Sequence, residues 1–155
     1  MLTLKGNRNG PLVVYTDGSC KSSGTGGWAA IIKCNKSITE LCGGELNTTN
    51  NRMELTAVIA ALRSVSSPSQ ITVYTDSQYI VKSINNNWLE TWTNNNWVKE
   101  DGDIVKNSDL WKDLIELMNK HDVSFIWIPG HSGDPMNERC DKLAKEQSKA
   151  RSDRR

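Results

Sequence analysis

Two segments of this chain repeat the same four residues, Val-Tyr-Thr-Asp, at positions 14–17 and 73–76. β-Branched and aromatic residues dominate both segments, which is typical of strands, and each segment ends in an aspartate followed by a serine-containing turn. If the two strands are parallel neighbours, Asp17 and Asp76 emerge at the same edge of the sheet, about 5 Å apart by the spacing of strands. The carboxyl edge of an α/β sheet is where such folds bind ligands. The repeat therefore predicts a shared site.

Two carboxylates this close repel each other, so the site needs a shared proton or a cation. Ligand sets made only of oxygen favour Mg²⁺ or Mn²⁺. Taken singly, either aspartate is more typical of a residue that caps the helix or turn after it. The repeat alone leaves both interpretations open.

The rest of the chain alternates between strand and helix patterns. We expect strands at 12–16, 28–34, 38–46, 71–75 and 123–128, and helices from 49–51 to about 62, at 77–84, around 110–118 and at 135–149. The glycine-rich segment 22–27 is expected to be a turn, and the polar residues 35–37 join two strands in a hairpin. This order predicts an α/β protein with a mixed sheet covered by helices.

Length and composition fit one domain of 155 residues, with 37% hydrophobic and 24% charged residues. The longest apolar run, 57–62, is far too short for a membrane span, and 1–10 lacks the apolar stretch of a signal peptide. We therefore expect a soluble, cytoplasmic protein that does not bind membranes. The four cysteines include no C-x-x-C pair, which favours reduced thiols over a zinc knuckle or a disulfide framework.

Four blocks of sequence carry the most specific motifs. They read Thr-Asp-Gly-Ser-Cys at 16–20, Thr-Thr-Asn-Asn-Arg-Met-Glu-Leu at 48–55, Thr-Asp-Ser-Gln-Tyr at 75–79, and Gly-His-Ser-Gly at 130–133 with Asn-Glu-Arg-Cys-Asp at 137–141. Together they resemble the type 1 ribonucleases H, the group of bacterial ribonuclease HI and the eukaryotic RNase H1 catalytic domain. The resemblance implies a ribonuclease H-like fold: a five-stranded mixed sheet, three antiparallel strands and then two parallel ones, with helices on both faces. It also implies an endoribonuclease that hydrolyses the RNA strand of RNA/DNA hybrids.

By this resemblance, four carboxylates hold two Mg²⁺ ions, for which Mn²⁺ can substitute: Asp17, Glu54, Asp76 and Asp141. Paired metals suit phosphodiester hydrolysis because one activates water and the other stabilises the leaving oxygen, which leaves a 5′-phosphate and a 3′-hydroxyl. Taken alone, Glu54 matches a capping box that starts at Asn51. Asp141 taken alone is an ordinary solvated helix residue.

The two histidines receive different interpretations. His131 lies in a loop with glycine on either side, and the resemblance implies that it helps in proton transfer or product release without binding metal. His121 follows the helix that ends near Lys120, and we expect a surface residue favoured by the helix dipole.

The resemblance also implies substrate contacts. Asn50, Glu54, Gln78 and the backbone near Ser19 and Cys20 are expected to face the RNA ribose, and Thr49 and Asn51 the DNA strand. Trp88, Trp92 and Trp97 match the aromatic positions of the family's substrate-binding handle. Capping of a helix explains 49–51 equally well and is compatible with binding phosphate. Packing within a helix explains the pair Trp88 and Trp92.

Two regions depart from the family pattern. Residues 85–103 carry one lysine and four acids where the bacterial family has clustered basic residues. Because neutralisation of phosphates dominates affinity for nucleic acids, we expect weaker hybrid binding and a raised Michaelis constant. The loop 20–27 is one residue shorter than usual and lacks Asn-Pro-Gly, so one contact with nucleic acid is in doubt.

We expect a short extension at 1–11, a catalytic domain at 12–149 with its tryptophan handle at about 85–106, and a basic tail at 150–155. The expected partner is an RNA/DNA hybrid, bound by a monomer without an obligate protein partner. Two alternatives remain open. One is a non-catalytic or weakly active hybrid-binding module, and the other is a superfamily nuclease domain from a retroelement.

Overall fold

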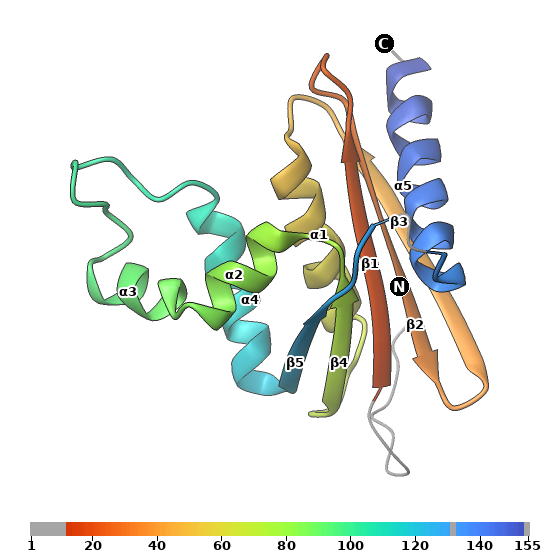
Figure 1. Ribbon diagram of the computed structural model, residues 1–155, viewed down its shortest axis with the longest axis horizontal. Coiled ribbons are helices and arrows are strands. Elements are labelled where there is room, and N and C mark those ends of the chain that lie inside the picture. Colours follow the sequence, from red (N-terminus) through yellow and green to blue (C-terminus); the bar gives the residue numbers. More distant parts are fainter. Residues whose placement is uncertain (1–11, 131–132, 154–155) are drawn as a thin grey trace.

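A five-stranded sheet forms the centre of the structure, a computed structural model that describes residues 12–130 and 133–153 (Figure 1). The strands are β1 (Leu12–Cys20), β2 (Gly26–Cys34), β3 (Ser37–Glu45), β4 (Gln70–Thr75) and β5 (Asp122–Trp127). The helices are α1 (Asn50–Arg63), α2 (Gln78–Asn85), α3 (Trp88–Asn94), α4 (Ser108–Lys120) and α5 (Pro135–Asp153).

The strands lie in the order β3-β2-β1-β4-β5. β1 pairs with β2, and β2 with β3, in antiparallel fashion, whereas β1 with β4 and β4 with β5 are parallel. The repeated segments are direct neighbours, because Val14 pairs with Val73 and Thr16 with Thr75. The predicted mixed sheet is confirmed, and so is the predicted meeting of the two repeats.

Helices cover both faces of the sheet. α1 packs on β1 and β2 and is itself covered by α4, while α5 packs on the opposite face of β1, β2 and β3 (Figure 1). The larger hydrophobic core lies between the sheet and α1, with fully buried Leu12, Val14, Leu55 and Leu62. A smaller core beneath α5 is built on Ile31.

β1 and β2 reach further than the sequence pattern predicted. The ladder between them continues through Ser19 paired with Gly27 and Cys20 paired with Gly26, so these glycines belong to a strand and not to the turn. A Cβ at Gly27 would lie 2.1 Å from the main-chain oxygen of Ala144 in α5. The glycine is therefore needed because helix and strand backbones nearly touch at this point.

The prediction for His121 is wrong, since its exposed fraction is only 4%. The residue ends α4, and its Nδ1 accepts a hydrogen bond of 3.1 Å from the main-chain N–H of Ser69. Burial lowers the pKa of the imidazole, and the charge of Lys120 lowers it further. His121 therefore joins the starts of β4 and β5 as a neutral residue.

No helix within residues 12–130 and 133–153 combines the length and the apolar character that a membrane crossing requires.

Candidate active site

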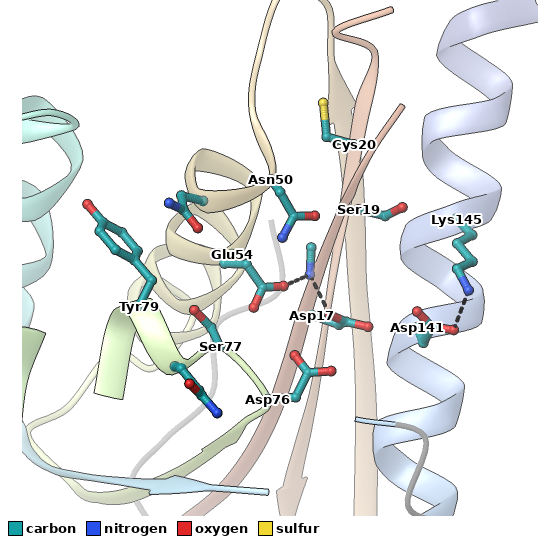
Figure 2. A pocket seen from close by; sticks show the side chains of 13 residues that line it. Asp17, Ser19, Cys20, Asn50, Glu54, Asp76, Ser77, Tyr79, Asp141 and Lys145 are labelled. Atoms are coloured by element: carbon teal, nitrogen blue, oxygen red, sulfur yellow. Dashed lines mark hydrogen bonds and ion pairs between the residues drawn. The ribbon is translucent and has the colours of Figure 1, made fainter. Parts of the chain in front are cut away.

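Three of the predicted carboxylates converge at the carboxyl edge of the sheet. Asp17 stands on β1, Asp76 directly follows β4, and Glu54 projects from the first turns of α1 (Figure 2). One oxygen of each side chain lies within 4.8 Å of the other two. Asp17 and Glu54 are only 4% and 3% exposed, so they are held in the interior and not on a mobile surface.

The backbone at Gly18 explains why Glu54 reaches this edge. Its N–H donates to Asp17 Oδ1 at 2.9 Å and also donates to Glu54 Oε1. A Cβ at this position would meet the main-chain nitrogen of Glu54 at 2.4 Å. The glycine after the first aspartate thus allows α1 to lie directly against β1, which brings a helix carboxylate to a strand carboxylate.

The electrostatics of this cluster favour a bound cation. The pKa of Asp17 is raised to about 7, chiefly by burial and also by the charges of Asp76 and Asp141, against the lowering effect of the Glu54 contact. Burial also raises the pKa of Glu54 well above its ordinary value, and the charge of Asp17 adds to the effect. A positive ion would relieve both costs, and an all-oxygen donor set fits a hard divalent cation.

The fourth carboxylate approaches from a different element. Asp141 lines the same pocket from α5, and its Oδ2 lies 3.0 Å from the ammonium nitrogen of Lys145, one helical turn later (Figure 2). The three-oxygen group described above does not include it. Sequence reasoning missed Lys145, although its spacing of four residues from Asp141 on a helix was the available signal.

The carboxylates open into a pocket of about 480 Å³. Its other walls include several of the residues predicted to contact the substrate: Ser19, Cys20, Asn50, Asn51 and Gln78. Sequence reasoning did not single out Ser77 and Tyr79, which also line the pocket and directly adjoin Asp76 and Gln78 in the chain.

Two further predicted residues do not line the described pocket. Thr49 is exposed, and its hydroxyl accepts a hydrogen bond of 3.2 Å from the main-chain N–H of Arg52, so it is the N-cap of α1. His131 lies outside the described residues. The segment that leads to it passes the site, because a Cβ at Gly130 would lie 2.8 Å from Asp76 Oδ2.

The predicted tryptophans form a cluster apart from the pocket lining. The ring centroids of Trp88 and Trp92, and of Trp92 and Trp97, are 6.1 Å apart, and Trp92 lies 6.0 Å from Trp111 on α4. Trp97 is only 8% exposed whereas Trp88 is 39% exposed. Packing therefore explains much of the surface that Trp92 and Trp97 bury, and of the three rings Trp88 is the most available for contact with a substrate.

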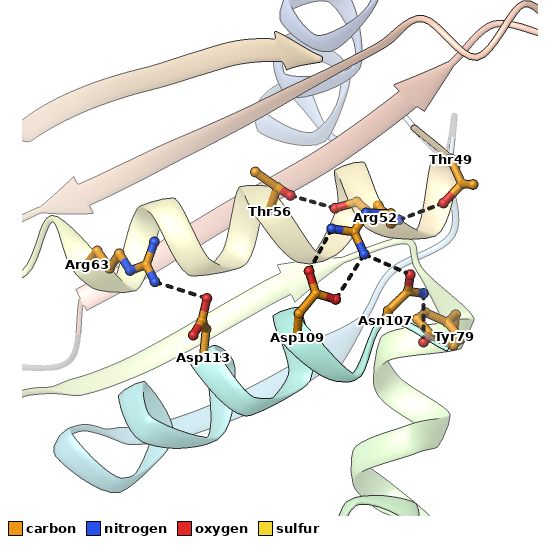
Figure 3. Close-up of polar contacts among 8 residues, drawn as sticks. All are labelled: Thr49, Arg52, Thr56, Arg63, Tyr79, Asn107, Asp109 and Asp113. Carbon is orange, nitrogen blue, oxygen red and sulfur yellow. Dashed lines mark hydrogen bonds and ion pairs between the residues drawn. The ribbon is translucent and has the colours of Figure 1, made fainter. Parts of the chain in front are cut away.

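A polar network connects the first turns of α1 to α4 and α2 (Figure 3). The guanidinium of Arg52 donates to both carboxylate oxygens of Asp109, at 3.0 and 2.9 Å, and to Asn107 Oδ1 at 3.3 Å. The hydroxyl of Tyr79 accepts from Asn107 Nδ2 at 3.2 Å and from Trp111 Nε1 at 2.8 Å. Tyr79 thus belongs both to the pocket wall and to the support of the tryptophan cluster.

Comparisons with known proteins agree with this geometry. The ribonuclease H family model matches residues 9–149. A ribonuclease H of Nitratidesulfovibrio vulgaris (strain DP4) is 50% identical over 141 residues, which cover 90% of each chain. A ribonuclease H of Hahella chejuensis is 52% identical over 132 residues, covering 84% of this chain and 88% of that protein.

A solved structure gives the same result for the fold. LC9-RNase H1, described as a type 1 RNase H with the type 2 active-site motif, superimposes with a TM-score of 0.79 at 28% identity, covering 97% of this chain and 74% of that one. Sequence, fold and the convergence of three carboxylates at one sheet edge thus point the same way, and the chain belongs to the ribonuclease H family of enzymes.

Proposed function

We propose that this enzyme hydrolyses the RNA strand of RNA/DNA hybrids with two Mg²⁺ ions held by four carboxylates, Asp17, Glu54, Asp76 and Asp141. The observation that carries the proposal is the group of three carboxylate oxygens within 4.8 Å of one another, two of them on buried side chains. When bound, a pair of divalent ions supplies a hydroxide near neutral pH, a clamp on the phosphoryl oxygens and relief for the leaving 3′-oxygen.

The chain's own residues prepare this chemistry. The N–H of Gly18 orients Asp17 and Glu54, so their oxygens need little rearrangement to bind cations. Lys145 pairs with one oxygen of Asp141 at 3.0 Å and places a positive charge at the wall of the pocket. His131, which lies outside the described residues, is proposed to help in proton transfer or product release without binding metal. The products are a 5′-phosphate and a 3′-hydroxyl.

Selection of the hybrid requires recognition of a 2′-hydroxyl on one strand. We assign this to short polar groups on the pocket wall: Ser19, Cys20, Asn50, Glu54 and Gln78. Their presence around the carboxylates supports the assignment. Thr49 and Asn51, at the start of α1, are assigned to the DNA strand, where a helix N-terminus favours phosphate. Trp88, Trp92 and Trp97 are assigned to contact with deoxyribose.

The organisation around the site is also proposed. The catalytic domain spans 12–149 with the handle at about 85–106, preceded by a short extension and followed by a basic tail. The enzyme acts in the cytoplasm as a monomer and needs no obligate protein partner, and Mn²⁺ can replace Mg²⁺.

The test is cleavage of a labelled RNA strand in a hybrid with Mg²⁺, Mn²⁺ or chelator, beside single-stranded RNA, duplex RNA and duplex DNA. We expect metal-dependent cleavage confined to the hybrid, and none by Asp17→Asn. Tight hybrid binding without cleavage under either metal would instead identify a binding module. Substantial Mg²⁺-dependent activity in Asp17→Asn would refute the assignment of the carboxylates.

A further inference from the structure

A large aromatic side chain stands beside the catalytic pocket without a role in the chemistry described above. Trp127, the last residue of β5, is 42% exposed. Its indole N–H donates to the main-chain oxygen of Asp76 at 3.3 Å, which holds the ring next to a proposed metal ligand. Other aromatic and aliphatic residues of the strand, such as Phe125 and Val123, pack against the core. Core packing therefore explains them better than it explains Trp127.

A second cavity, of about 210 Å³, lies at this ring. Its lining consists of Gln78, Val81, Lys82 and Trp127. Gln78 also lines the catalytic pocket, so this one side chain borders both cavities. A strand that extends from the carboxylates past Gln78 would reach the indole.

The lining surface of this cavity is apolar, and Lys82 contributes its hydrocarbon stem to it, which leaves the ammonium group to meet a phosphate outside the cavity. Lys82 follows Gln78 by four residues on α2, so the two side chains lie on the same face of the helix, one turn apart. No ion pair within the described ranges involves the Lys82 ammonium. A flat ring beside an unpaired ammonium is the combination that proteins use to hold a sugar–phosphate strand, because the ring packs on the sugar or base and the charge neutralises phosphate.

We infer that Trp127 and Lys82 form a binding site for the RNA strand beside the scissile phosphate. The indole packs against a ribose, and the ammonium binds the neighbouring phosphate. This inference rests on the proposed function, since the assignment of the strand follows from the assignment of Gln78 to the RNA ribose. It also offers a source of affinity that does not depend on the charge-poor handle.

The first experiment measures kcat and KM on a hybrid for Trp127→Ala, Trp127→Phe and Lys82→Met. Lys36→Met is the control, because Lys36 is exposed in the turn between β2 and β3, at the opposite end of the sheet from the carboxylates. Loss of a ring contact is worth about tenfold in binding, so we expect Trp127→Ala to raise KM about tenfold while kcat changes by less than about twofold. Phenylalanine keeps a flat ring without the N–H, so Trp127→Phe should have a KM close to that of the wild type.

The second experiment identifies which phosphate of the hybrid the Lys82 ammonium contacts. Single phosphates of either strand are replaced by neutral methylphosphonates, one position at a time. In the wild type, one position on the RNA strand beside the cleavage site should raise KM, and in Lys82→Met that position should have no further effect. The slope of log KM against log salt should also be less steep in Lys82→Met by about 0.7 to 0.9, the contribution of one phosphate.

Three results would overturn the inference. They are a KM for Trp127→Ala and Lys82→Met equal to that of Lys36→Met, a coupled phosphate on the DNA strand, and a fall in kcat at unchanged KM in both Trp127 variants. The last result would mean that Trp127 only supports Asp76 through its N–H. Failure of the proposed function looks different, because the wild type itself would then not cleave the hybrid with either metal.

Discussion

The catalytic edge, formed by Asp17, Glu54 and Asp76, and the handle, residues 85–106, are built in opposite ways. The edge is anchored in the middle of the sheet, and two of its three carboxylates are almost fully buried. The handle has no buried residue in α3, and it is attached through Trp92, whose ring lies 6.1 Å from that of Trp97 and 6.0 Å from that of Trp111. Under the proposed function, chemistry is tied to side chains held in the interior, while affinity depends on a surface whose charges can change at little cost to the fold.

The sharpest way to expose this difference is Asp76→Asn. The change removes one charge from the three-carboxylate group, and because metal ions contribute several kcal/mol to the transition state, kcat should fall by about 1000-fold or more. Hybrid binding, measured by fluorescence anisotropy, should change far less. Asp113→Asn is the matched control, since this aspartate pairs with Arg63 on the surface. A comparable loss of kcat in both variants would contradict the separation.

The handle should respond in the converse way to added charge. The test is the double variant Asn94→Lys/Asn95→Lys. Each lysine that reaches a phosphate should steepen the slope of log KM against log salt by about 0.9, and KM should fall several-fold at low salt. Turnover at saturating hybrid should stay within about twofold, because the chemistry lies elsewhere. Asn119→Lys, at the far end of α4, is the control for a non-specific effect of charge. An unchanged salt slope would show that the handle does not approach the phosphates.

The pH dependence of stability distinguishes the two regions without substrate. The pKa of Asp17 in the folded state is raised from 3.8 to about 7. In the metal-free protein its contribution to the free energy of unfolding is therefore fully present below about pH 4 and is lost as the pH rises through 7. The melting temperature of wild type minus Asp17→Asn should therefore decline over this range, by about 2–4 °C for each 1 kcal/mol. The lowered pKa of His121 has the opposite effect, because stability is lost as pH falls below its ordinary 6.5. Both proteins contain His121, so this contribution cancels when their melting temperatures are subtracted.

Mg²⁺ at millimolar concentration should abolish that decline, because the cation replaces the proton between the carboxylates. A handle variant such as Trp88→Ala should keep the wild-type pH slope. A flat difference curve without metal would show that the charge of Asp17 is already compensated in the folded state.

The two regions also differ in how far the sequence predicts them. Asp17 and Asp76 could be placed together only on the condition that the two repeats are parallel neighbours, since such strands end at the same edge, and the pairing of β1 with β4 meets that condition. The position of Glu54 needed the family resemblance, since its spacing equally suits a capping box. The reason for this position is the contact of α1 with Gly18, a tertiary contact that the local sequence pattern does not predict.

The sequence did not predict the positions of residues that are set by contacts between distant elements. His121 looked like a solvated helix end, and is buried because the N–H of Ser69 finds its acceptor there. Trp127 reads in the sequence as one more apolar residue of a strand, and only the structure places it beside Asp76. Periodicity reports which side of an element is apolar, but not what another element brings to that side.

The smallest effect is expected where the two regions meet, at Tyr79. Tyr79→Phe removes the acceptor for Trp111 Nε1 and Asn107 Nδ2, and the two lost hydrogen bonds together cost about 1–2 kcal/mol. Thermal unfolding should shift down by about 2–8 °C. Tyr74→Phe is the matched control, because the Tyr74 ring stacks on Tyr15 at 5.0 Å and its hydroxyl makes no hydrogen bond within the described residues.

The kinetic result of Tyr79→Phe decides how independent the two regions are. Because the network supports Trp111, and through it Trp92, loosening it should raise KM for the hybrid by about twofold and leave kcat nearly intact. If kcat falls instead, the pocket wall and the tryptophan cluster must be treated as one unit whose packing positions the carboxylates. Affinity and chemistry would then be coupled through the single hydroxyl that both regions share.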